Sequence, residues 1–192
     1  MTSLKARYWQ TFASSRVANA MLFNLSWFAI LVTQSSIIAP VIVVLHLLAH
    51  FRFMDKRRGE LVLVVGVTVC GAVIDQALFL TGVFKLAGQI APAPLWMTCL
   101  WPVFATTLMH AFDGFQHRLV LAALFGAVGG PLSYLAGVGL TSVAFASPLW
   151  GPVIVGVLWA SVFPLMLTFS ARLNRDRDAL QSWEPPVRQA LD

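Results

Sequence analysis

Residues 60–84 read ELVLVVGVTVCGAVIDQALFLTGVF, an apolar run whose interior holds a single carboxylate, Asp75. A helix of about 20 apolar residues crosses the hydrocarbon core of a bilayer, so this run predicts a transmembrane helix. A carboxylate inside such a span is costly unless it has a partner or reaches water. Asp75 is therefore the first candidate for a functional residue.

The rest of the chain repeats this apolar character. Of its 192 residues, 58% are hydrophobic and 11% are charged, and the mean hydropathy is +0.78. These values are far from those of a soluble domain. We predict an all-α membrane protein, a bundle of six transmembrane helices. The six apolar segments are residues 18–35, 36–53, 61–84, 94–112, 119–140 and 148–170.

The basic residues predict how the bundle is oriented. With six spans and a cytoplasmic N-terminus, every Lys and Arg except Lys85 falls on the cytoplasmic side, as the positive-inside rule requires. Five spans would put the basic cluster at 52–58 on the wrong side. We expect residues 1–17 to be a cytoplasmic N-terminal segment, 18–170 a single transmembrane domain and 171–192 a cytoplasmic polar tail.

Small residues recur at helical spacing in the third and fifth segments, which suggests that these helices pack together. Gly71 lies on such a stripe in the third segment, and Gly126 and Gly130 lie on one in the fifth. Small faces let helix backbones approach closely in lipid. We expect the two helices to cross near Gly71 and Gly130. The sequence Gly129-Gly130-Pro131 also predicts a break in helix five, because proline cannot donate to the carbonyl of residue 127.

A polar site is predicted at the depth of Asp75. At about 1.5 Å per residue, the third, fourth and fifth helices bring one set of residues to this level. The set is Asp75, Gln76, Trp101, Ser133 and Tyr134. We expect Asp75 to face the bundle interior as a neutral acid that donates a hydrogen bond to Tyr134 or Ser133. Gln76 should point elsewhere.

The histidines offer a different chemistry. His46 and His50 are four residues apart, on one face of the second helix, and His110 begins a stripe with Asp113 and His117. Together they could bind a metal ion. The chain has four histidines in total, however, and interfacial histidines commonly face lipid headgroups. We therefore expect no cofactor and no metal, with His46, His50 and His110 as the candidates if a metal is bound.

Two stretches carry a resemblance to a known family. They are residues 94–108, PLWMTCLWPVFATTL, and residues 126–137, GAVGGPLSYLAG, with Asn24 to Trp27 and Asp75 as further points of likeness. The chain resembles a small bacterial inner-membrane family that is catalogued only as a domain of unknown function, number 2878. The resemblance covers most of residues 18–170. It implies a bacterial inner-membrane location and a helical fold, and it implies no activity.

Three functions remain open from the sequence. The first is a protein that binds or moves a small amphiphile, a lipid or a proton through the site around Asp75. The second is a non-catalytic accessory subunit of a larger envelope or lipid-modifying system. The third is a membrane enzyme with a histidine-bound metal, although the sequence favours a protein that is no enzyme. Expected partners are membrane lipids and a second membrane protein or further copies of this chain, and no nucleic acid, because the basic residues serve orientation.

Overall fold

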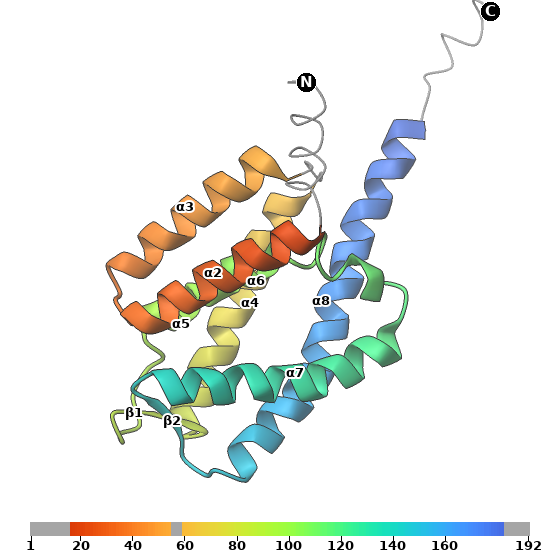
Figure 1. Ribbon diagram of the computed structural model, residues 1–192. Coiled ribbons are helices and arrows are strands. Elements are labelled where there is room, and N and C mark those ends of the chain that lie inside the picture. The colour runs from red at the N-terminus through yellow and green to blue at the C-terminus, as the bar shows by residue number, and fades with distance from the viewer. Residues whose placement is uncertain (1–15, 55–58, 183–192) are drawn as a thin grey trace, which may run out of the picture.

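The chain folds into a helical bundle with a small two-stranded sheet at one end (Figure 1). The computed structural model describes residues 16–54 and 59–182. Most of the predicted N-terminal segment, the basic residues 56–58 and the end of the predicted tail lie outside the described residues. The elements are α2 (Arg16–Thr33), α3 (Ile38–Phe53), α4 (Glu60–Leu80), β1 (Phe84–Leu86), α5 (Leu95–Thr98), α6 (Leu100–Ala105), the 3-10 helix η1 (Asp113–Phe115), α7 (Leu119–Leu140), β2 (Val143–Phe145) and α8 (Trp150–Ser182).

Four helices in the described part of the chain are long and apolar enough to cross a membrane. They are α2, α4, α7 and the first 25 residues of α8. The predicted second and fourth spans are shorter, because α3 has 16 residues and regular helix in the fourth segment is confined to residues 95–105. The helical fold class is confirmed, and six spans remain a prediction.

Successive segments nevertheless run between the same two ends of the bundle. At one end, Arg16 forms an ion pair with Asp113, with Arg16 Nε 2.7 Å from Asp113 Oδ1. At the other end, Gln34 accepts hydrogen bonds from the backbone and the hydroxyl of Ser142. The antiparallel pair β1 and β2 joins the turns at this second end, with Phe84 opposite Phe145. The strand begins where the third predicted span was expected to end, because Gly82, at φ 77°, turns the chain after α4.

The exposed faces of the helices are apolar, and the buried polar side chains lie within a largely apolar interior. Along α2, the exposed side chains are Val17, Met21, Leu25, Phe28 and Val32, which lie on one face at helical spacing. The buried side chains of the bundle include Asn19, Ser26, His46, His50, Glu60, Asp75, Thr106 and His110. An exposed apolar stripe of this kind is unfavourable in contact with water and favourable in contact with lipid.

Proline interrupts the helix of the fourth segment and leaves the helix of the fifth segment continuous. The sequence predicted a break in the fifth. The helix is interrupted at Cys99, between α5 and α6, where Pro102 has no N–H for the carbonyl of Thr98. Beyond Phe104 the chain continues in tighter i to i−3 turns. In contrast, α7 runs unbroken from Leu119 to Leu140 through Pro131, so the expected break is not observed. The carbonyl of Ala127, which Pro131 leaves free, lies against Gly156 of α8, so the neighbouring helix supports α7 at this point.

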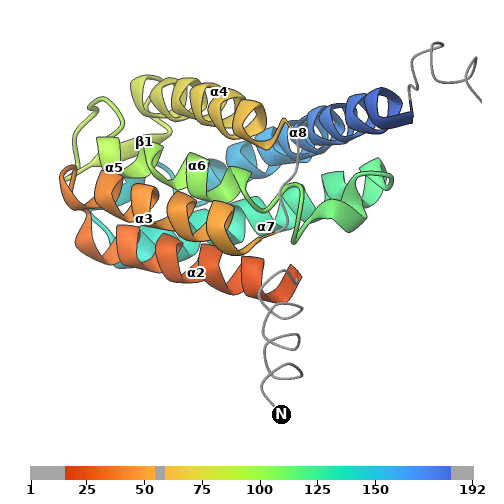
Figure 2. The same cartoon turned by 90° about the horizontal axis from the view of Figure 1, so that it is seen from above.

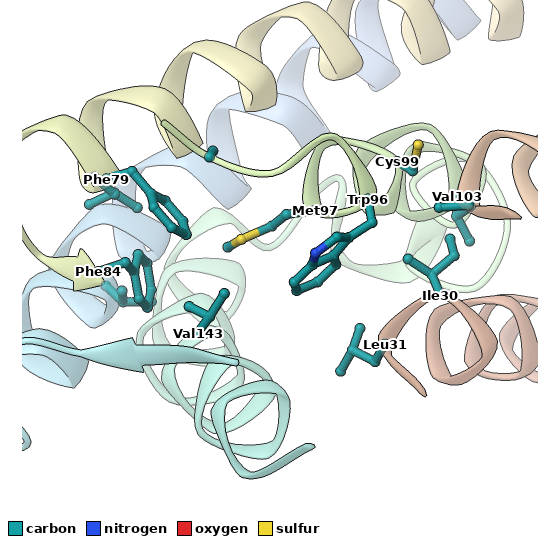
Figure 3. Packing of buried hydrophobic residues seen from close by; sticks show 13 residues of the cluster. Ile30, Leu31, Phe79, Phe84, Trp96, Met97, Cys99, Val103 and Val143 are labelled. Atoms are coloured by element: carbon teal, nitrogen blue, oxygen red, sulfur yellow. The ribbon is translucent and has the colours of Figure 1, made fainter. Parts of the chain in front are cut away.

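The fourth segment is central to the packing. Seen from above, α6 lies between α4 on one side and α2 and α3 on the other (Figure 2). The largest helix-to-helix contact is between α7 and α8. Where α2, α5 and the two strands meet, Trp96 and Met97 pack among Leu31, Phe84 and Val143 (Figure 3). This cluster forms one wall of the cavity described next.

Candidate functional site

Asp75 is fully buried in α4 and accepts hydrogen bonds from two neighbouring helices. Trp101 Nε1 of α6 donates to Asp75 Oδ2 at 2.7 Å, and the Tyr134 hydroxyl of α7 donates to Asp75 Oδ1 at 3.4 Å. An indole nitrogen is a donor only, so Asp75 Oδ2 accepts from Trp101, and the expectation that Asp75 is a neutral acid stays a prediction. Its main partner is Trp101 and not Tyr134.

The other two residues of the predicted site point elsewhere. Gln76 forms paired hydrogen bonds with the backbone of Ala93, both at 3.2 Å, which agrees with the expectation that it is directed away from Asp75. The Ser133 hydroxyl donates to the carbonyl of Gly130 at 2.8 Å within α7. Ser133 is therefore not a partner of Asp75, because a serine inside a helix has an acceptor one turn back along its own backbone.

Two stacked tryptophans fill the place where α4 and α7 were expected to meet. The Trp101 and Trp159 rings lie 5.6 Å apart between centroids at an interplanar angle of 4°. A Cβ on Gly71 would overlap the Trp101 ring, and one on Gly130 would overlap Trp159. The prediction that the two small faces meet each other is wrong. Each face receives an indole ring instead, because a large flat side chain fills the space beside a glycine.

A cavity of about 230 Å³ opens beside this pair, between α2, the fourth segment, α7 and α8. Its aromatic lining includes Phe23, Trp27, Trp96, Trp101, Tyr134 and Trp159. The face of α7 that borders it is formed by Gly126, Gly129, Gly130, Ser133 and Gly137. Asp75 is the one carboxylate among the described lining residues, and it lies behind Trp101 and Tyr134. Ser133 and Phe125 both line the cavity and are exposed, so the cavity reaches the surface along α7.

A second polar cluster lies nearer the end that carries Arg16, and His46 is its first member. His46 Nδ1 lies 2.9 Å from the Ser26 hydroxyl, and His46 Nε2 lies 3.0 Å from the Thr106 hydroxyl. Thr106 itself donates to the carbonyl of Val103 at 2.7 Å. Thr106 must therefore accept from His46, so the proton lies on Nε2 and Nδ1 accepts from Ser26. Both ring nitrogens of His46 are satisfied by hydroxyl groups.

His50 and His110 converge on one carboxylate, that of Glu60. Both Nε2 atoms lie 2.8 Å from Glu60 Oε1, and all three side chains are buried. Glu60 Oε2 is also buried and has no hydrogen-bond partner among the described residues. The stripe expected to start at His110 does not hold together, because Asp113 pairs with Arg16 and His117 is exposed. Sequence reasoning treated Glu60 only as the start of a helix.

Asn19 of α2 links this cluster to the fourth segment. Its Nδ2 donates to the carbonyl of Thr106 at 3.2 Å and lies 3.4 Å from His50 Nδ1, while its Oδ1 accepts from the backbone of Ala111 at 3.3 Å. Asn19 was missed as well. The signal available was an amide inside an apolar run, the same signal that singled out Asp75.

Together these features define a helical protein with an aromatic cavity that reaches the surface along α7 and with two internal polar clusters. A family described as "Protein of unknown function (DUF2878)" matches residues 16–165, and the chain belongs to this family, which confirms the resemblance seen in the sequence. No curated protein and no solved structure matches the chain.

Proposed function

We propose that the chain is an integral membrane protein that binds a small amphiphile in the cavity beside Trp101 and Trp159. The observation that carries this proposal is an aromatic cavity that reaches the surface along α7, an apolar helix. Pockets of this kind bind ligands through apolar contact and a few polar groups. A ligand that enters along the apolar, exposed face of α7 comes from the bilayer, which makes a lipid or another membrane-dissolved molecule the natural occupant. We place the protein in a bacterial inner membrane, as the family resemblance implies.

The cavity is suited to one apolar chain or ring. A cavity of about 150 Å³ lined by apolar side chains already accommodates benzene. At about 230 Å³, this one has room for a longer hydrocarbon segment. The donor for the polar end of the ligand is Trp159 Nε1, which is buried beside Tyr134 and interacts with that side chain without forming a regular hydrogen bond. The proposed ligand therefore carries a hydroxyl or carbonyl oxygen next to its apolar part.

Asp75 has a positioning role in this proposal. It is fully buried, and its two oxygens are engaged by Trp101 and Tyr134, so it fixes the orientation of two cavity walls. Rigid aromatic walls lower the conformational cost of binding. The proposal does not need a proton to move through Asp75.

Glycines of α7 give the test a matched pair of variants. Gly129 lines the cavity, and a Cβ there would make only ordinary contact with the Phe125 ring, 3.5 Å away. Gly139, on the same helix, lies outside the cavity lining and would meet nothing within 4 Å. Gly129→Leu should therefore fill the cavity without disturbing the fold, and Gly139→Leu should change neither.

The measurement is photo-crosslinking of the purified chain with a long-chain alcohol that carries a diazirine. We expect labelled peptides from α2, α7 and α8 in the wild type and in Gly139→Leu, with a severalfold loss in Gly129→Leu. Equal labelling in both variants, or labels confined to the exposed stripe of α2, would exclude the cavity as a binding site. The accessory-subunit function would then be the better explanation.

A further inference from the structure

We propose that His50, Glu60 and His110 bind a divalent transition-metal ion, with Zn²⁺ as the ion whose preferences they match. This site is separate from the cavity, and none of its three residues lines the cavity. The inference does not depend on the proposed ligand or on any enzymatic activity.

Three segments far apart in the sequence bring the ligand atoms together. His50 belongs to the end of α3, Glu60 is the first residue of α4 and His110 follows α6. The ligand atoms all lie within 4.8 Å of one another, and each Nε2 is 2.8 Å from Glu60 Oε1. Zinc binds imidazole nitrogen and carboxylate oxygen at about 2.0–2.2 Å, and two histidines with a glutamate are a common protein ligand set for it. Small side-chain movements bring all three groups to those distances.

Hydrogen bonds within the described part of the chain do not satisfy every polar atom of the cluster. Both imidazoles bind the same carboxylate oxygen, while Glu60 Oε2 is buried and has no partner in the described part of the chain. No Lys or Arg of that part forms an ion pair with Glu60; the ion pairs found join it only to His50 and His110. A buried carboxylate is costly without a cation, and a divalent ion supplies the positive charge and engages the free oxygen.

Asn19 sets a condition for metal binding, because it determines which ring nitrogen of His50 carries the proton. Its position, held by Thr106 and Ala111, directs Nδ2 at His50 Nδ1. In the metal-free cluster the His50 proton therefore lies on Nε2, where it reaches Glu60. A metal at Nε2 leaves the single imidazole proton on Nδ1, facing the Asn19 amide. That contact is 3.4 Å long, so the bond given up is weak.

This condition yields a variant that separates metal binding from hydrogen bonding. Asn19→Asp would place a carboxylate oxygen beside His50 Nδ1, which is the outer partner that metal-bound histidines usually have. Such partners change metal affinity by about 10–100-fold. A purely hydrogen-bonded cluster would gain nothing from a second buried acid next to Glu60. Tighter metal binding in Asn19→Asp is therefore expected only if the cluster binds a metal ion.

The experiment measures bound Zn²⁺ in the full chain, purified in detergent with an affinity tag that contains no histidine. After incubation with Zn²⁺ and removal of free ion, mass spectrometry should find one Zn²⁺ per chain. Glu60→Gln and His110→Asn should lower the affinity at least tenfold. Asn19→Asp should raise it. His117→Ala, which alters an exposed histidine outside the cluster, should match the wild type.

Each result decides for or against the site. Size-exclusion elution and helical circular dichroism establish that each variant is folded. If Glu60→Gln is not folded, the comparison between wild type, Asn19→Asp and His117→Ala still decides. Zn²⁺ uptake that is absent in the wild type, or lost equally in His117→Ala, overturns the proposal. Unchanged or weaker binding in Asn19→Asp would show that His50 Nε2 does not bind the ion.

Discussion

The Trp101 and Trp159 rings are stacked within 4° of parallel, and each has a glycine at its back, Gly71 in α4 and Gly130 in α7. The four residues form a stack that bridges α4 and α7, two helices that are also joined by the hydrogen bond from Tyr134 to Asp75. Asp75 fixes one of the rings through its hydrogen bond with Trp101 Nε1.

Gly130→Leu is predicted to destabilise the fold strongly. A Cβ at this position would overlap the Trp159 ring, and overpacked sites cost about 1–3 kcal/mol or more. Gly139→Leu is the control, because it puts the same side chain on the same helix in open space. Thermal unfolding in detergent should show a lower midpoint for Gly130→Leu only. Equal midpoints would mean that Trp159 moves aside without cost.

Asp75→Leu is predicted to destabilise the chain more than Asp75→Asn. Leucine leaves Trp101 Nε1 buried without an acceptor, which costs about 1–3 kcal/mol, whereas an asparagine oxygen can still accept from the indole. The ligand-labelling experiment should show the same order, since Asp75 orients the wall. If Asp75→Asn abolished labelling while stability was kept, Asp75 would act through its charge or its proton.

The ion pair between Arg16 and Asp113 is predicted to contribute little. Their side chains are 66% and 26% exposed, and exposed pairs contribute under about 1 kcal/mol. Asp113→Asn should shift the unfolding midpoint only slightly, and less than Asp75→Leu does. A large loss of stability would show that Asp113 has a further partner at this end of the bundle.

Membrane topology can be tested with two small residues at opposite ends of the bundle. Gly114 would meet nothing within 4 Å, and Ala144 is exposed in β2, so both accept cysteine in a chain whose own Cys70 and Cys99 are replaced. With both termini inside, a membrane-impermeant thiol reagent added to intact cells should label Ala144→Cys and not Gly114→Cys. The opposite pattern would invert the orientation, and labelling at both positions would place both ends of the bundle outside.

Apolar pattern and charge predicted the helices better than they predicted the contacts between them. The fifth predicted segment coincides with α7, Leu119–Leu140, because its apolar run ends at both sides in polar residues. The fourth was predicted too long, since proline and i to i−3 turns limit regular helix to residues 95–105. The depth of each residue along its helix was enough to predict that Asp75 lies near Trp101 and Tyr134.

The histidine cluster required tertiary information. The spacing of His46 and His50 correctly puts both on one face of α3, yet His46 binds Ser26 and Thr106 while His50 binds Glu60. Which partner each histidine receives depends on the neighbouring helices. Nothing in the spacing of Glu60 and His110, which are 50 residues apart, indicates that they meet.

The hydrogen bonds of Asn19 have a consequence for the order of assembly during synthesis. Ser26 and His46 belong to consecutive helices and can pair as soon as the hairpin of α2 and α3 enters the membrane. Asn19 and Glu60 can each contact His50 of α3 early, but Asn19 gains its bonds to the backbone of Thr106 and Ala111, and Glu60 its bond to His110, only when the fourth segment arrives. An early hairpin therefore keeps unmatched polar groups in contact with lipid or with the insertion machinery. The first half of the chain therefore cannot satisfy all of its buried polar groups by itself. The fourth segment supplies the remaining hydrogen-bond partners.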